Sequence, residues 1–311
     1  MKSYSEFRRN TISIFLLLFT SLFYFTNCSG DRSLNIGIIK GEFLHDDINR
    51  EYILYLPKDL RKNASLVVVL HGFTSNSKKI MDYSEMNKIA EENNFAVVYP
   101  QGTRDKQSNT FWNVGYEFHA EIKVNDPEFV VELVKSLQDE YSLSKTNTFV
   151  TGMSNGGEMC YLLSCQFPHM FRAAAPVAGT MMNDFFDDCS PSNPIPIFAI
   201  FGNNDKTTNY FGDVENNDGW GAYQSIPFIL DFWINTMNLH LTEIDTLPNL
   251  IIEDSSYVVS QKYVRTEDEI EFLFYEVIGG GHDWPGAWGN KDMNTSKEIW
   301  NFFQRHAQPN N

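Results

Sequence analysis

Residues 148–163, TFVTGMSNGGEMCYLL, decide the fold. The apolar run 147–152 predicts a strand, and a helix is expected from about residue 155, so GMSNG lies in a sharp strand-to-helix turn. Gly152 and Gly156 suit this turn because it crowds backbone against backbone, where a side chain would clash. A serine in this setting has its hydroxyl exposed above the end of a sheet. Ser154 is therefore predicted to be a nucleophile, with an ordinary turn serine as the alternative.

Strand-like and helix-like segments alternate on both sides of this turn. The segments that predict strands are 50–57, 65–72, 95–102, 147–152, 171–179, 194–202, 257–264 and 269–278. The segments that predict helices are 81–94, 126–143, 226–237 and 294–306. This alternation predicts an α/β fold with a mostly parallel central sheet and helices on both faces. Asp126 is expected to cap the helix 126–143.

Composition narrows the classes of partner. The 311 residues carry 24 Lys and Arg against 40 Asp and Glu, a formal net charge of −16. Such a chain repels a phosphate backbone, so no nucleic-acid partner is expected. No proline-rich linker or repeat interrupts the order of segments, and residues 36–311 are expected to form one catalytic domain.

The first 27 residues are interpreted as a signal peptide. Lys2, Arg8 and Arg9 precede a nearly uncharged apolar run, residues 11–25. This run is shorter than the roughly 20 residues of a spanning helix, which disfavours the alternative of a membrane anchor.

Cys28 stands directly after this segment, where bacterial lipoproteins place the cysteine that becomes lipidated, although Phe25 and Asn27 are not the preferred residues before it. Residues 28–35 would form a short linker. The chain is therefore predicted to be exported, either as a cell-envelope lipoprotein anchored through Cys28 or as a freely secreted protein.

Three further cysteines follow. Cys160 and Cys165 are five residues apart on the helix expected after the turn, so they lie on different faces and are poor partners. Cys165 with Cys189 is the favoured disulfide, and three buried reduced thiols are the alternative.

A nucleophilic serine needs a base, and the base needs an orienting carboxylate. The expected chain order is serine, acid, histidine. Asp205 follows the predicted strand 194–202, where loops at the carboxyl ends of parallel strands gather catalytic groups. It is the predicted acid, and the other carboxylates of this region, which are more simply solvated, are Asp213, Asp218 and Asp231.

The base is predicted from the same order. His282 lies in the glycine-rich sequence GGGHDWPG, directly after the last predicted strand. His306 follows the terminal helix and is interpreted as a helix-end cation. His282 is therefore the predicted general base.

An oxyanion intermediate needs preorganised donors. One is expected from the amide of Asn155, directly after the nucleophile, and the second from the amide of Phe73 in the sequence LHGF. His71 precedes the serine in the chain and is interpreted as a brace for this loop.

The sequences LHGFTSN, GMSNGG, APVAGT, FGNND and GGGHDWPG occur in this order. Together they resemble the extracellular polyhydroxybutyrate depolymerase and feruloyl esterase group of the α/β-hydrolases, from about residue 36 to residue 306. The resemblance implies the α/β-hydrolase fold and an ester hydrolase whose triad is Ser154, Asp205 and His282. It also implies the pairing of the cysteines at 165 and 189. Phe73 departs from the depolymerases, which often have cysteine there, and this leaves the substrate open.

Trp284, beside His282, and Trp112 are candidate substrate-pocket residues, and core packing is the alternative for both. The spacing of metal ligands and phosphate-binding glycines is missing, so no metal and no cofactor are expected. The acidic sequence GDVENNDG at 212–219 is interpreted as a solvated loop.

The sequence therefore predicts an exported serine carboxylic ester hydrolase that works through an acyl-enzyme. A serine peptidase of the same fold and a catalytically inactive surface binding protein are the alternatives. Because no room is left for a separate polymer-binding domain, soluble oligomers or acylated polysaccharide are expected as substrates. A membrane would be involved only through a lipid on Cys28.

Overall fold

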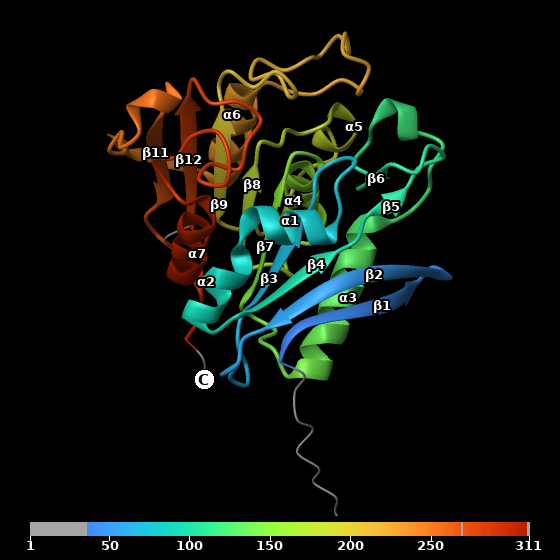
Figure 1. Cartoon of the computed structure of the whole chain (residues 1–311). Coiled ribbons are helices and arrows are strands. Elements are labelled where there is room, and N and C mark those ends of the chain that lie inside the picture. Colours follow the sequence, from blue (N-terminus) through green and yellow to red (C-terminus); the bar gives the residue numbers. More distant parts are fainter. Residues whose placement is uncertain (1–35, 269, 310–311) are drawn as a thin grey trace, which may run out of the picture. The chain divides into compact units, whose positions relative to one another are not determined.

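A computed structural model describes residues 36–268 and 270–309. The predicted signal peptide, the linker 28–35 and Cys28 lie outside this part. Within it, ten strands form one sheet (Figure 1). From edge to edge the strands are β1 (Gly37–His45), β2 (Ile48–Leu56), β4 (Ala96–Pro100), β3 (Leu66–Leu70), β7 (Thr148–Met153), β8 (Ala173–Val177), β9 (Ile197–Gly202), β12 (Ile270–Ile278), β11 (Tyr257–Arg265) and β10 (His240–Thr246). The described residues also include a short pair, β5 (Thr103–Arg104) and β6 (Thr110–Phe111).

The centre of the sheet is parallel. The six neighbouring strands β4, β3, β7, β8, β9 and β12 all run parallel to one another. The pairs β1 and β2 at one edge, and β11 and β10 at the other, are antiparallel. All five residues of the central strand β3 are buried, as expected for a parallel strand covered on both faces. The predicted α/β class with a mostly parallel sheet is confirmed.

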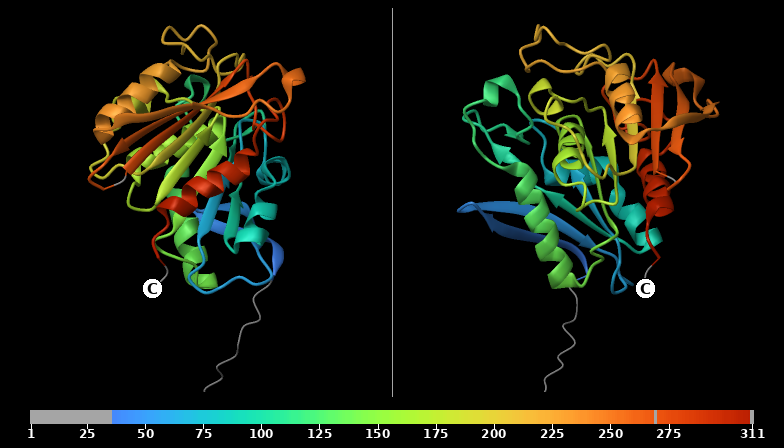
Figure 2. Two further views of the ribbon diagram at one scale, coloured as in Figure 1. Left: turned by 90° about the vertical axis from the view of Figure 1, so that its left-hand side faces the viewer. Right: turned by 180° about the vertical axis from the view of Figure 1, so that it is seen from behind.

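Helices cover both faces of the sheet (Figure 2). One face packs against α3 (Asp126–Tyr141), α4 (Asn155–Gln166) and α6 (Ile226–Met237). The other packs against α1 (Ser77–Ser84), α2 (Met86–Asn93) and α7 (Thr295–His306). Successive side chains of β3 alternate between these two cores, because side chains of a strand point to opposite faces. The remaining short helices are η1 (Glu117–His119), α5 (Asn183–Phe186) and η2 (Ile252–Asp254).

Two details of the helices differ from the sequence predictions. The helix predicted over 81–94 is divided into α1 and α2 by Glu85, whose φ of 51° cannot continue a helix. The cap of α3 is Asn125, whose side chain accepts a hydrogen bond from the Glu128 amide. Asp126 is buried instead, and its Oδ1 lies 2.6 Å from an Arg50 guanidinium nitrogen.

The two edge strands were missed by the sequence patterns. β1 pairs with β2 through a two-residue turn in which Asp46 and Asp47 have φ of 48° and 60°. The Asp-Asp pair is a weaker hairpin signal than Asn-Gly. Every residue of β10 is exposed, so this strand has no apolar alternation to detect. None of the described helices has the length and apolar character needed to span a membrane.

Candidate active site

Ser154 occupies the turn between β7 and α4. Its backbone has φ 57° and ψ −123°, a conformation that side chains rarely adopt, and its amide donates to Val177 O at 2.9 Å. Helix α4 begins at the next residue, so the unpaired amides of its first turn surround the serine. This is the strained strand-to-helix turn that the sequence predicted.

Close backbone packing leaves no room for side chains around the turn. A Cβ at Gly152 would lie 2.5 Å from Gly156 O, and a Cβ at Gly157 would lie 2.8 Å from Val177 O. Atoms at these distances overlap, so β7, α4 and the end of β8 can meet this closely only with glycine at these positions. The position of Ser154 is thus set by backbone packing.

Asp205 and His282 come from neighbouring strands. Asp205 follows β9 and His282 follows β12, and these strands are paired in parallel, so their carboxyl ends lie side by side. His282 Nδ1 lies 2.7 Å from Asp205 Oδ2, and the Asp205 side chain is fully buried. Asp205 Oδ1 accepts hydrogen bonds from the amides of Thr207 and Thr208 at 2.7 and 2.9 Å. The carboxylate is therefore fixed on both oxygens, and it orients the imidazole.

Ser154 and His282 line two cavities. The larger, of about 590 Å³, is lined by both residues together with Gly72, Phe73, Ser75, Lys79, Ile80, Asp82, Tyr83 and Met153. The smaller, of about 270 Å³, is lined by both residues together with Phe73, Thr74, Tyr116, Glu158, Met182, Thr207, Thr208, Trp220 and Tyr223. The serine and the histidine therefore line both cavities.

The loop after β3 passes next to the serine. A Cβ at Gly72 would lie 3.3 Å from Ser154 Cβ, which is a tight contact, and 3.8 Å from its Oγ, so this backbone lies directly beside the serine. The backbone nitrogens of Phe73 and Asn155 have no acceptor among the described residues. Both are available to an oxygen bound beside Ser154.

His71 braces this loop. Its Nδ1 lies 2.8 Å from Gly72 O, and its Nε2 accepts from the Gly102 amide at 3.0 Å. Burial lowers the pKa of His71 to about 4, so the ring is neutral near neutral pH. The interpretation of His71 as a brace agrees with these contacts.

Neither tryptophan named as a pocket candidate lines the two cavities. Trp284 is 1% exposed and packs in the core against α7, with its indole nitrogen 3.2 Å from Ser296 Oγ. Trp112 is fully buried, and its indole nitrogen donates to His71 O at 2.8 Å. The pocket role expected for them is therefore replaced by packing for Trp284 and by support of the His71 loop for Trp112.

Sequence reasoning missed a carboxyl group in the smaller cavity. Glu158 is 4% exposed, and its Oε2 accepts a 2.7 Å hydrogen bond from Tyr116 OH and a 3.4 Å bond from Asn155 Nδ2. Burial raises the pKa of Glu158 to about 7, against the opposing effect of these hydrogen bonds and of His282. One signal could have found it, because Glu158 lies four residues after the serine and so on the same face of α4.

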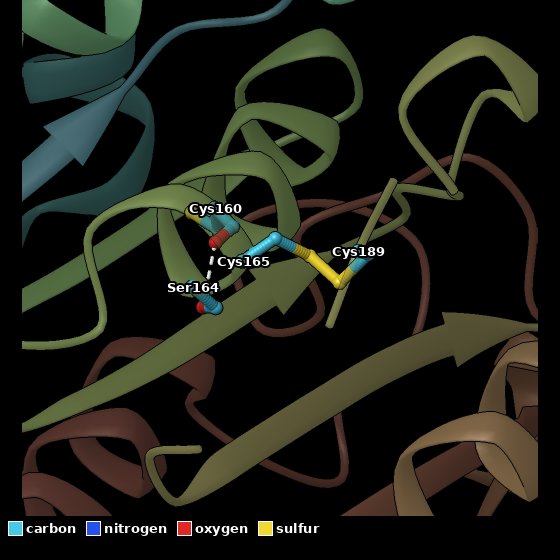
Figure 3. Close-up of a disulfide and its surroundings, with 4 residues drawn as sticks. All are labelled: Cys160, Ser164, Cys165 and Cys189. Carbon is cyan, nitrogen blue, oxygen red and sulfur yellow. Dashed lines mark hydrogen bonds between the residues drawn. A yellow bond between two sulfur atoms is a disulfide. The ribbon is translucent and has the colours of Figure 1, made fainter. Parts of the chain in front are cut away.

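Cys165, near the end of α4, is joined to Cys189 by a disulfide with Cα atoms 5.1 Å apart (Figure 3). This is the pair that the sequence favoured. Cys160 is buried with a free thiol, and its backbone carbonyl accepts a hydrogen bond from Ser164 Oγ at 2.7 Å. The bridge ties the helix behind Ser154 to the segment after α5.

Comparison with known proteins agrees with the motifs. Residues 50–192, which include the loop after β3 and the Ser154 turn, match the family model described as Esterase PHB depolymerase. The matched segment is a little under half of the chain. The resemblance predicted from the motifs of this segment is confirmed.

Two curated relatives illustrate the similarity. Acetylxylan esterase A of Talaromyces purpureogenus is 26% identical over 177 residues, which are 56% of this chain and 45% of that protein. Poly(3-hydroxyalkanoate) depolymerase C of Paucimonas lemoignei is 25% identical over 185 residues, which are 60% of this chain and 43% of that protein. The chain spans less than half the length of these relatives.

A solved structure extends the comparison to most of the chain. The acetyl xylan esterase from Aspergillus awamori superposes with a TM-score of 0.63 at 16% identity, over 87% of this chain and 100% of that one. The likeness shows the fold, which is the predicted α/β-hydrolase fold.

Proposed function

We propose that this protein is a serine carboxylic ester hydrolase that works through an acyl-enzyme. The observation that carries the proposal is the 2.7 Å contact between His282 Nδ1 and Asp205 Oδ2 at a cavity that His282 shares with Ser154. An imidazole held in this way presents Nε2 to a nucleophile. The esterase domain match and the names of both relatives support the same reaction class.

The proposed first half-reaction forms the acyl-enzyme. Ser154 Oγ attacks the ester carbonyl carbon while His282 Nε2 takes the hydroxyl proton, and Asp205 stabilises the resulting imidazolium. The amides of Asn155 and Phe73 bind the oxyanion of the tetrahedral intermediate. When the intermediate collapses, the bond to the alcohol oxygen breaks, and His282 returns the proton to that oxygen.

The second half-reaction releases the acid. His282 takes a proton from a water molecule, which attacks the acyl carbon, and the same two amides bind the new oxyanion. The bond to Ser154 Oγ then breaks and the serine regains its proton. Proton transfer by one positioned histidine serves both steps.

The substrates that we propose are soluble hydroxyalkanoate oligomers or acyl groups on polysaccharide. Acetylxylan and poly(3-hydroxyalkanoate), in the names of the relatives, are both carboxylic esters. Export is part of the proposal, and the disulfide between Cys165 and Cys189 supports it because such bonds persist in oxidising compartments.

Replacing Ser154 tests the reaction class. Ser154→Ala should lower kcat for p-nitrophenyl acetate by about 10⁴-fold or more, while the circular dichroism spectrum stays unchanged. Ser164→Ala, on the helix that follows the Ser154 turn, is the matched control and should keep activity. Retained turnover in Ser154→Ala would refute the assignment.

Two further assays separate the alternatives. A fluorophosphonate probe should label the wild type at Ser154, since that reaction needs an activated serine, and an inactive binding protein would stay unlabelled. An aminoacyl anilide should be turned over far more slowly than the ester. The reverse preference would indicate a peptidase.

A further inference from the structure

The smaller cavity contains a buried carboxyl group that the proposed reaction does not use. Glu158 is 4% exposed and lines this cavity together with Ser154 and His282. Its Oε2 already accepts hydrogen bonds from Tyr116 OH and Asn155 Nδ2. Its Oε1 accepts none from the described residues, so it is the carboxyl atom that remains for a ligand.

The rest of the cavity wall suits a small, neutral, hydroxylated group. Thr208 and Tyr223 bring hydroxyl groups, while Phe73 and Trp220 bring aromatic faces that pack with ring centroids 5.5 Å apart. A volume of about 270 Å³ lies below that of a cavity for a drug-sized ligand, so one monomer unit is the scale that fits. Lysine and arginine are missing from the residues that line this cavity, so an anionic group would find neither of these cations there.

We propose that Glu158 is a specificity-determining residue, whose Oε1 accepts a hydrogen bond from a hydroxyl group near the scissile ester. The inference rests on the proposed function and adds the chemical class of the group in the smaller cavity. A buried acceptor discriminates strongly, because a substrate without the hydroxyl leaves it unpaired. The hydroxyl could belong to a hydroxyacyl group or to the sugar of an acylated polysaccharide.

Two pairs of esters test the proposal and separate these sources. The acyl pair is p-nitrophenyl 3-hydroxybutyrate and p-nitrophenyl butyrate, and the alcohol pair is methyl 2-O-acetyl-xyloside and cyclohexyl acetate. For each pair the measured quantity is the ratio of kcat/KM for the hydroxylated ester to that for the plain ester. Glu158→Gln keeps the size of the side chain and removes its charge.

In one of the two pairs, assayed above about pH 8 where Glu158 is ionised, Glu158→Gln should lower this ratio by about tenfold, since a hydrogen bond to a charged group is stronger than a neutral one. The pair that responds shows which side of the ester carries the hydroxyl. Glu91→Gln is the matched control, because Glu91 accepts a 2.6 Å hydrogen bond from Tyr55 on the far surface helix α2, and it should leave both ratios unchanged. If Glu158→Gln lowered kcat/KM equally for both esters of each pair, the proposal would be overturned. Glu158 would then serve only to support Tyr116 and Asn155.

A binding measurement keeps this inference distinguishable from the proposed reaction. Calorimetry on Ser154→Ala should show tighter binding of methyl 3-hydroxybutyrate than of methyl butyrate, or of methyl xyloside than of cyclohexanol. Adding Glu158→Gln should remove the difference. A persistent difference would overturn the role of Glu158, whereas an unreactive wild type with intact Glu158-dependent binding would refute only the esterase assignment.

Discussion

The indole nitrogen of Trp112 donates a 2.8 Å hydrogen bond to the carbonyl oxygen of His71. The backbone of Trp112 is also paired with the side chain of Asn155, which accepts from its amide at 2.6 Å and donates to its carbonyl at 3.1 Å. One tryptophan thus links the two segments whose amides, at Phe73 and Asn155, we propose to bind the oxyanion. We therefore expect the distance between these two amides to change when this link is removed.

Trp112→Phe should reduce kcat for p-nitrophenyl acetate by roughly 10 to 100-fold with a smaller change in KM, since displaced donors lose transition-state binding. Trp284→Phe is the control, because it removes an equally buried indole hydrogen bond, to Ser296, outside the cavities. It should lower the free energy of unfolding and leave kcat within twofold. Equal kcat losses in the two variants would show that general destabilisation is the cause.

Asp205→Asn should lower kcat by about 10⁴-fold, as replacing the orienting acid does in other serine hydrolases, because an amide can hold the imidazole in the wrong tautomer. Asp213→Asn is the matched control. Asp213 also accepts two backbone amides, those of Asn217 and Asp218 at 2.9 and 2.8 Å, but it does not contact His282. Steady-state kinetics that showed similar activity in both variants would contradict the role of Asp205.

Reducing the disulfide should lower the free energy of unfolding by about 3 kcal/mol, the value expected for a loop of this length. Cys165 and Cys189 are 24 residues apart in the sequence. Urea denaturation with and without reductant should show this loss in the wild type and in Cys160→Ala. The double variant Cys165→Ala, Cys189→Ala should not respond to reductant, and a response there would assign the effect to another thiol.

Glu158 should make the stability of the protein depend on pH. Burial raises its folded-state pKa from 4.5 to about 7, so between these values the folded state holds a proton that the unfolded state has lost. The stability that Glu158 contributes through this proton is fully present below pH 4.5 and is lost as pH rises toward 7.

The unfolding free energy of Glu158→Gln, measured against that of the wild type, should therefore rise by about 3 kcal/mol over this interval. Chemical denaturation at closely spaced pH values measures the difference. A difference that stays constant with pH would contradict the raised pKa.

The strands of the sheet could be predicted because they are apolar runs, and the main residues of the site could be predicted because they follow such runs. Asp205 and His282 are 77 residues apart, yet each directly follows a strand, and parallel pairing of β9 with β12 brings them into contact. Motif order is enough to name such residues, since the carboxyl ends of parallel strands share one edge.

The cavity walls could not be predicted in this way. Trp284 stands two residues after His282, but its ring turns into the core beneath α7, and only the packing of distant segments decides that direction. Glu158 is assigned to the cavity by its contact with Tyr116, 42 residues earlier in the chain. The spacing from Ser154 places Glu158 on the same face of α4, but local patterns contain no information about its pairing with Tyr116. The exposed edge strand β10 was missed for the related reason that it packs on one neighbour alone.

The glycines beneath Ser154 also bear on how this protein can change. Because Gly152 and Gly157 admit no side chain, mutations there would displace the nucleophile, and a library that varies them would consist mostly of inactive clones. Met182 and Trp220, by contrast, line the smaller cavity and take no part in the proposed reaction. New substrate preferences can therefore evolve by exchanging these walls while the backbone under the serine stays constant.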